Sequence, residues 1–467
     1  MKKLWIVLLS VALIAAFAMP VCAADVKFSG SYVIQGYYDN DRALLSNGGA
    51  SVSNVWQRLR LQADFKIQEG LSFTTRADIL QKVWGAQRGV SPATYSPFAY
   101  LLAQQAPGVS GEDENIKFTH AYVSANIFGG LLRAGYQTQA KFGTDWGDSG
   151  EAYYGPRVRY DYPIGPWTLI ALWDKIEGSE YYSPSGPSGN VESASYQVDA
   201  QADKYVGAFV YDWGKGNAGL LIYYYNITTL SSTTFNVTNF GVVPLDAKIN
   251  LWIFDPYVKA QLGPVYFEAE VVYLTGQERN WQSNVGKTNV DRSGWSAYAS
   301  ATYDFAPMYA GLSFMYSEGQ DPNKTDSTIG SGGGSDFNPC LMLFNYDLGR
   351  WEGGYGNPAY GSSVVMDNGI QNAIMGQVFF GIKPVPKLDI RASFTVAQAD
   401  QPGAATGWQS KDYGNEFDLT ATYKIYDNLS YMVGFGYLWA GDYWKGTNPA
   451  AQISNDYLVT HKLTLSF

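Results

Sequence analysis

The sequence predicts an all-β protein, a transmembrane antiparallel up-and-down β-barrel of about eighteen strands, and three observations support this fold class. The chain begins with a basic and then apolar stretch, segments of alternating polarity recur after it, and the last segment ends on Phe467. Alternation with a period of two is typical of strands that have one face in lipid and the other in water. Because bilayer hydrocarbon cannot satisfy backbone polar groups, such strands must close into a barrel without edges.

The amino-terminal segment has the pattern of a secretory signal peptide. Met1–Lys3 is basic, Leu4–Met19 is almost entirely apolar, and small residues suited to cleavage follow up to Ala24. A segment of this kind is removed on export and does not remain as an anchor. We therefore expect a signal peptide over 1–24 and a single barrel domain over 25–467.

The composition agrees with a barrel and argues against several other classes of protein. Tyr (36) and Trp (14) are abundant, and both residue types suit the interfaces of a bilayer. After residue 24 there is no apolar run long enough for a transmembrane helix. Removing Lys2 and Lys3 from the 32 basic residues leaves 30 against 42 acidic residues, a net charge of −12, which argues against nucleic-acid binding. Cys340 is then the single cysteine, so no disulfide within the chain is expected.

Eighteen segments of alternating polarity follow residue 24, and the spacers between them are short and long in turn. This order is typical of outer-membrane barrels, in which short turns face the periplasm and long loops face outward. Sixteen strands is the main alternative, because the segments 156–162 and 248–261 alternate less cleanly. Pro256 predicts a bulge in the second of these segments. The predicted strands cover 26–38, 55–67, 71–82, 116–127, 131–142, 156–162, 166–176, 199–211, 218–228, 248–261, 264–275, 293–305, 308–318, 371–383, 387–398, 413–426, 429–440 and 455–467.

The short spacers carry the residues that tight turns require. Glycine allows positive φ angles, proline fixes φ, and asparagine or aspartate side chains bond the nearby backbone. Both termini are expected on the periplasmic side. The predicted turns are Gln68–Gly70, Gly129–Gly130, Pro163–Gly165, Trp213–Asn217, Leu262–Gly263, Ala306–Pro307, Pro384–Pro386 and Asp427–Asn428.

Two of the long external loops, 83–115 and 319–370, are long enough to carry a function. The second contains the glycine run Gly330–Gly334, followed by the apolar patch Cys340–Phe344. An apolar patch in a polar loop needs shielding from water. It could fold into the barrel mouth and narrow it, or it could pack against neighbouring loops.

Charged residues on the predicted strands indicate a water-filled interior. In the segment 55–67, Arg58, Arg60, Asp64 and Lys66 share the even-numbered face, and the odd-numbered face is apolar from residue 59 onward. An Arg or Lys that faces lipid at mid-bilayer costs about 2–4 kcal/mol, so the charged face must line a lumen. The same alternation predicts further pore-lining residues at Arg76, Asp78, Arg133, Lys141, Arg157, Arg159, Asp161, Glu268, Glu270, Asp389, Arg391, Glu416, Asp418 and Lys424.

The predicted lumen has a basic side and an acidic side. The inward arginines concentrate on the second to sixth strands, whereas the later strands are more acidic. Opposite walls of opposite charge produce a transverse field that orients dipolar solutes. Alternatively, opposite charges pair between neighbouring strands and only keep the lumen hydrated. Both arrangements can hold at once, and a barrel of 16–18 strands is wide enough for an aqueous channel.

Few residues suit catalysis or metal binding. The two histidines are His120 and His461, and Ser124 lies about 13 Å from His120 along an extended strand, too far for a direct hydrogen bond. Asp321–Asp326 lacks the spacing of a calcium loop. No hydrolase, zinc-protease or nucleotide-binding motif occurs. We therefore expect no enzymatic activity, no metal and no cofactor.

The carboxyl terminus resembles a known family signature. In Asn455–Phe467, Tyr457, Val459 and Leu463 lie on one apolar face, which ends on the aromatic Phe467. This ending resembles the C-terminal signature of Gram-negative outer-membrane β-barrel proteins. The resemblance implies that the barrel-assembly machinery reads Phe467 and inserts the chain into outer-membrane lipid.

Taken whole, the mature chain resembles Gram-negative outer-membrane porins and is similar to the eighteen-stranded alginate-export-like barrels. Arg58–Phe65 and Tyr423–Lys445 carry the likeness best. The resemblance implies a water-filled channel for passive diffusion of small hydrophilic, anion-leaning solutes, and it is compatible with a homotrimer. Two alternatives remain, a selective channel for an acidic sugar or polysaccharide and a non-conducting barrel that is a scaffold or sleeve for a partner protein. Asp64, Asp78 and Asp161 interleave with the arginines, which argues against a dedicated polyanion conduit.

Overall fold

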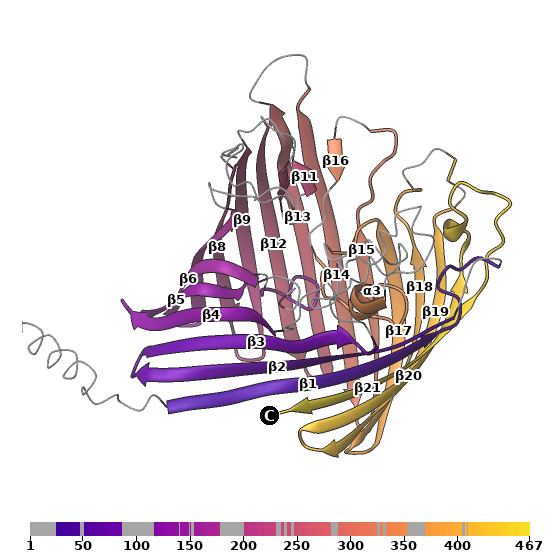
Figure 1. The fold of residues 1–467 in the computed structure, drawn as a ribbon, viewed down its shortest axis with the longest axis horizontal. Coiled ribbons are helices and arrows are strands. Elements are labelled where there is room, and N and C mark those ends of the chain that lie inside the picture. Colours follow the sequence, from indigo (N-terminus) through magenta and orange to yellow (C-terminus); the bar gives the residue numbers. More distant parts are fainter. Residues whose placement is uncertain are drawn as a thin grey trace, which may run out of the picture.

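Antiparallel strand pairing runs around the whole computed structural model and closes on itself (Figure 1). The last strand, β21, pairs with the first, β1, so the wall has no free edge. Among the described residues the main sheet has 19 strands; 18 of them close the barrel, and the short β16 pairs only with the end of β14. The structure describes residues 25–46, 51–85, 116–139, 141–148, 150, 154–177, 200–229, 235–237, 241–243, 247–281, 288–324, 327–329, 333–352, 369–403, 407–408 and 410–467.

The wall strands are long and are joined alternately by tight turns and longer connections. The minor elements are β10 (Phe235–Val237), β11 (Gly241–Val243), β16 (Ser327–Ile329), helix α3 (Tyr346–Glu352) and a 3-10 helix (Asp442–Lys445). The eighteen barrel strands are β1 (Asp25–Asp39), β2 (Val52–Gln68), β3 (Leu71–Val83), β4 (Ile116–Ile127), β5 (Gly130–Thr138), β6 (Tyr154–Ile164), β7 (Trp167–Glu177), β8 (Ala200–Asp212), β9 (Gly216–Thr229), β12 (Ala247–Leu262), β13 (Val265–Trp281), β14 (Val290–Phe305), β15 (Met308–Ser317), β17 (Ala373–Val385), β18 (Leu388–Gln398), β19 (Asp412–Tyr426), β20 (Leu429–Ala440) and β21 (Asp456–Ser466).

The eighteen predicted strands are confirmed, and the alternative of sixteen is wrong. The predicted segments 116–127 and 429–440 coincide with β4 and β20. The largest differences are the predicted strand 131–142, which ends at Thr138 in β5, and the predicted strand 264–275, which continues to Trp281 in β13. After Thr138 the chain leaves the wall, because the residues that follow bind other strands across the lumen, as described below.

Pro256 does not produce the predicted bulge. The pairs with β13 before and after the proline, at Phe254 and Tyr257, keep one register, and the shift that does occur lies between Lys248 and Asn250. Proline removes one N–H donor but does not require an inserted residue. The neighbouring pairs therefore hold the ladder in register through this position.

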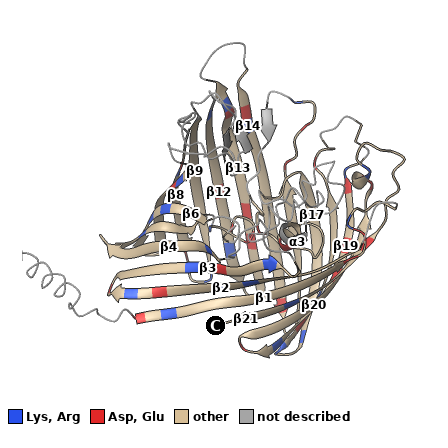
Figure 2. Ribbon diagram, in the orientation of Figure 1, with Lys and Arg blue, Asp and Glu red and all other residues tan. Residues whose placement is uncertain are grey.

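Side chains alternate between an apolar outer face and a polar inner face. On β17, for example, Val378 is 52% exposed, whereas Gln377 is 4% exposed and donates a hydrogen bond to Pro339 inside the barrel. On the other side of the ring, Lys and Arg segments alternate with Asp and Glu segments along β2 and β3 (Figure 2). Among the described residues, no helix is both long and apolar enough to cross a bilayer.

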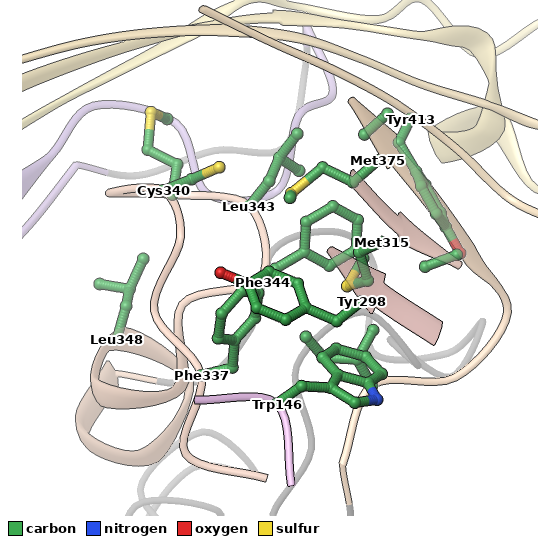
Figure 3. Close-up of a cluster of buried hydrophobic side chains, with 14 of the residues drawn as sticks. Trp146, Tyr298, Met315, Phe337, Cys340, Leu343, Phe344, Leu348, Met375 and Tyr413 are labelled. Atoms are coloured by element: carbon green, nitrogen blue, oxygen red, sulfur yellow. The ribbon is translucent and has the colours of Figure 1, made fainter. Parts of the chain in front are cut away.

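Two segments fold into the barrel and bury a hydrophobic cluster there (Figure 3). Residues 139–150, which follow β5, are termed the β5 loop, and residues 333–348, between β15 and β17, are termed the β15 loop. The β5 loop contributes Trp146 and the β15 loop contributes Phe337 to the cluster. The apolar patch Cys340–Phe344 is buried with them. Folding into the barrel is therefore the arrangement that this patch adopts.

Several predicted features lie outside the described residues. These are the signal peptide at 1–24, most of the connection 83–115, and parts of the connection 319–370. The signal peptide and the domain boundary at residue 25 therefore stay predictions.

Candidate functional site

Charged side chains on the inner faces of β2 and β3 form the first part of the candidate site. Arg60 donates hydrogen bonds of 2.7 and 2.9 Å to the two carboxylate oxygens of Asp78, because these residues are direct partners across the strand pair. Asp64 accepts a hydrogen bond of 2.7 Å from the Thr74 hydroxyl. The carboxylates are therefore held by specific partners on the same wall.

Arginines on β5 and β6 continue this basic side. Arg159 donates hydrogen bonds of 2.8 and 3.1 Å to the carboxylate of Asp161, and Arg133 bonds the same carboxylate. Two guanidinium groups thus share one carboxylate, which leaves this group with a net positive charge. Arg157 differs because it is 4% exposed and is locked to Asp174 by hydrogen bonds of 2.6 and 2.8 Å.

The β5 loop crosses the lumen from β5 to β13 and β14; its residues 140 and 149 lie outside the described part. Glu270 on β13 accepts hydrogen bonds from the Thr144 N–H at 2.6 Å, the Thr144 hydroxyl at 2.5 Å and the Gly147 N–H at 3.2 Å. The indole N–H of Trp146 donates to the hydroxyl of Ser296 on β14 at 3.1 Å. The loop is therefore fixed to a wall that is six strands away around the ring.

The β15 loop is fixed to β19 in a similar way. The N–H groups of Met342 and Leu343 donate to the two carboxylate oxygens of Glu416, each at 2.7 Å. The N–H of Leu341 donates to Asp418 at 3.3 Å. Three successive backbone donors therefore point at two neighbouring carboxylates of the wall.

The two loops meet inside the barrel. The N–H of Gly334 donates a hydrogen bond of 2.6 Å to the carbonyl oxygen of Trp146. The Trp146 ring meets Phe337 edge to face at 5.6 Å between centroids and stacks on Tyr298 of β14 at 6.3 Å. The contact occupies the space next to β14 and leaves a cavity on the other side, toward β3 and β5.

This cavity has a volume of about 460 Å³ and lies between the basic side of the wall and the two loops. Arg76 of the wall, Lys141 of the β5 loop and three loop carboxylates line the same space, so a solute inside it meets both signs of charge. The lining residues are Arg76, Thr138, Lys141, Asp145, Asp148, Gly150, Asp336, Phe337 and Asn338.

Asp148 in the β5 loop has a perturbed acidity. Burial raises the pKa of its carboxyl above the ordinary value, and this effect outweighs the opposing attraction of Lys141 and the hydrogen bond from the Gly150 N–H. A carboxyl with a raised pKa takes up a proton at a higher pH than an exposed aspartate does. As the pH falls, Asp148 therefore loses its negative charge before an exposed aspartate would.

Three of the predicted pore-lining carboxylates are covered by the loops. Glu270, Glu416 and Asp418 are 1, 0 and 4% exposed. They point into the barrel, as the alternation predicts, but backbone N–H groups of the loops contact them. They hold loops in place and do not border the cavity.

The other predicted residues have inner-face partners away from the cavity or lie near the turns. Glu268 accepts a hydrogen bond of 3.1 Å from the Tyr298 hydroxyl, and Arg391 donates one of 3.0 Å to Gln377. Lys141 lies on the β5 loop and not on a strand, because β5 ends at Thr138. Lining of the pore by this set as a whole stays a prediction. Outside the cavity lining lie Arg58, Lys66, Asp389 and Lys424.

Sequence reasoning missed the loop carboxylates Asp145, Asp148 and Asp336. The segment Gly143–Gly150 (GTDWGDSG) has three glycines in eight residues, which is typical of a loop, and it falls in the connection predicted between the strands 131–142 and 156–162. The sequence therefore placed a loop there. It could not have shown that the loop turns inward.

Side chains with metal-binding or catalytic chemistry are engaged in packing. His120 faces inward, with Nε2 3.0 Å from the Thr138 hydroxyl. The sulfur of Cys340 and the carboxylates of Glu416 and Asp418 gather within 4.8 Å. Because backbone N–H groups already point at both carboxylates, this cluster suits a fixed loop better than a cation.

Comparison with solved structures identifies the fold. Acinetobacter baumannii OccAB1 is similar over 95% of this chain and 97% of its own, with a TM-score of 0.52 and 11% identity. Pseudomonas aeruginosa OccK2 in complex with glucuronate (12% identity, 95% and 98% covered, TM-score 0.48) and the outer membrane channel DcaP of A. baumannii (13%, 95% and 98%, 0.44) were also found. No protein-family model and no curated protein matches the sequence. The closed eighteen-stranded barrel of this chain therefore has a fold similar to that of OccAB1.

Proposed function

We propose that this protein is an outer-membrane porin that forms a water-filled channel for passive diffusion of small hydrophilic, anion-leaning solutes. The observation that carries the proposal is the cavity between the basic wall and the loops. Arg76 and Lys141 line it, and Arg133 and Arg159, which share a single carboxylate, lie on the same wall. A low-dielectric wall focuses the field of such charges and raises the local concentration of anions.

The outer face and the chain end support the placement in an outer membrane. A closed barrel with an apolar exterior satisfies every backbone group within the wall, as lipid demands. The backbone N–H and carbonyl groups of Phe467 bond Gly30 at 3.0 and 2.8 Å, so the last residue joins the seam between the first and last strands. This position agrees with a role for Phe467 in assembly. A homotrimer stays a prediction.

The proposed passage uses the two signs of charge in different ways. The wall arginines attract the negative group of a solute, while Asp145, Asp148 and Asp336 on the loops repel it and attract a positive group. A solute therefore crosses the cavity in a preferred orientation. The loop carboxylates repel a long polyanion. If the channel is selective, a small acidic sugar is therefore a better candidate substrate than an acidic polysaccharide.

Planar-bilayer recording of the purified protein under a KCl gradient tests the proposal. We expect discrete channel steps and a reversal potential on the anion-selective side. The selective alternative predicts saturable block of the current by an acidic sugar. Absence of any conductance from folded protein would contradict the channel and favour the scaffold or sleeve.

A further inference from the structure

Three acidic residues on the inner face of the later strands bind loops inside the barrel. Glu270 on β13 and Glu416 and Asp418 on β19 are almost completely buried. Each carboxylate receives hydrogen bonds from a loop that enters the barrel, and each loop comes from another part of the ring. These three lumen acids are therefore attachment points for the loops.

The contact at Glu270 fixes one end of the arrangement. One carboxylate oxygen accepts all three donors of the β5 loop, the Thr144 N–H and hydroxyl and the Gly147 N–H. Three hydrogen bonds that converge on one oxygen fix the position of the loop backbone on β13. The same short stretch carries Asp145 and Asp148, so this contact sets where two of the cavity carboxylates stand.

The contact at Glu416 and Asp418 fixes the other loop. Its three donors are consecutive backbone N–H groups, and a peptide in water would satisfy these groups equally well with solvent. The wall carboxylates replace that solvent and hold the β15 loop inside the barrel. Asp336, which faces the cavity, lies five residues before the first of these donors.

We propose that Glu270 and the Glu416–Asp418 pair are two carboxylate clasps, positioning residues that hold the β5 and β15 loops across the lumen and so set the width and charge selectivity of the channel. The inference rests on the proposed channel function. The loops also contact each other through Gly334 and Trp146, so together they narrow the lumen. Loss of either clasp should therefore let one of the two loops move out of the lumen. The clasp residues act through the loops and touch no solute.

Single-channel recording of Glu270→Ala and Glu416→Ala tests the clasps. We expect a rise in conductance of roughly twofold, since an unobstructed barrel of 16–18 strands holds a wide aqueous channel, together with more frequent conductance steps as the loop moves. Reversal potential should shift toward anions in Glu270→Ala, because Asp145 and Asp148 leave the cavity. Glu270→Gln keeps an acceptor oxygen and should lie between the wild type and Glu270→Ala.

Asp212→Ala is the matched control, because Asp212 accepts a hydrogen bond of 2.7 Å from the Gly214 N–H in a short turn away from the loops. Its conductance and reversal potential should equal those of the wild type. Thr144→Val removes one donor from the loop side and leaves the wall unchanged. Its effect should not add to that of Glu270→Ala, because both substitutions break the same contact.

The outcomes separate the clasps from the channel itself. If the wild type does not conduct, the proposed function fails, whatever the variants do. If the wild type conducts and Glu270→Ala and Glu416→Ala match Asp212→Ala, the clasps are contradicted. If the wall variants fail to fold, as judged by heat-dependent mobility on denaturing gels, Thr144→Val decides: wild-type conductance and selectivity in that variant contradict the clasp at Glu270.

Discussion

The two sides of the lumen differ in what their charged residues contact. On β2 to β6, Arg60 pairs with a wall aspartate, and Arg133 and Arg159 share another, so the charges stay on the wall beside the open cavity. On β13 and β19, Glu270 and Glu416 bond loop backbone and are sealed from water. The same alternation of polar residues thus produces a surface of paired charges on one side and a loop-anchoring surface on the other.

The comparison shows that facing the lumen and lining the channel are separate properties. A charged residue on the inner face must avoid lipid, and it does so equally well in water or under a hydrogen-bonded loop. The carboxylates that line the cavity, Asp145, Asp148 and Asp336, lie on the loops, whereas Glu270, Glu416 and Asp418 of the wall hold those loops.

The largest effect is expected at the contact between the two loops. Trp146 is fully buried and bonds Ser296 and the Gly334 N–H. Trp146→Ala should cost about 3–5 kcal/mol of packing free energy. We expect this loss to separate the two loops, whereas the hydrogen bonds between the strands keep the barrel folded. Single-channel recording should show a wider, noisier channel.

Trp173→Ala is the control for that substitution, because Trp173 is 40% exposed on the outer face of β7. Its channel should be like the wild type. An unchanged conductance in Trp146→Ala, with the barrel folded, would mean that the loops do not narrow the passage.

A smaller effect is expected on the basic side. Asp161→Asn removes the carboxylate that Arg133 and Arg159 share and leaves both guanidinium groups uncompensated. The reversal potential under a KCl gradient should move further toward anions, at little change in conductance. Asp203→Asn is the control, because Asp203 bonds Lys175 away from the cavity. This variant should have the reversal potential of the wild type. Equal shifts in the two variants would contradict a local effect of the wall charges.

The smallest effect is a dependence of selectivity on pH. Because the pKa of Asp148 is raised by burial, its carboxylate is neutralised at a pH above the ordinary value of about 4. Anion preference should therefore increase as the pH falls from neutral toward that value. In Asp148→Asn the increase should be missing, and a response equal to that of the wild type would assign the titration to another group.

Periodicity was sufficient to predict the wall, because each strand must satisfy lipid on one face and water on the other. Strands such as β4 and β20 match their predicted bounds for this reason. The loops follow no such rule. Nothing in the spacing of Glu270 or Glu416 indicates that a loop will cover them, since those contacts join residues 126 and 74 positions apart in the chain.

The site was accordingly predicted in part. Arg76 lines the cavity as expected, and Arg60 pairs with its cross-strand partner as the alternative of local neutralisation anticipated. Lys141 reaches the cavity from a loop and not from a strand. Glu416 is covered by backbone N–H groups of a loop, and every residue except proline carries such a group. The pattern of side chains therefore could not predict the burial of Glu416.

The most direct test of the account compares the reversal potential of the wild type with that of Arg58→Ser/Arg60→Ser/Arg159→Ser in the same KCl gradient. These three arginines belong to the basic side, where Arg60 and Arg159 bond the wall aspartates Asp78 and Asp161. The account predicts a clear shift toward cation preference with the conductance nearly retained. An unchanged reversal potential in the folded triple variant would contradict it.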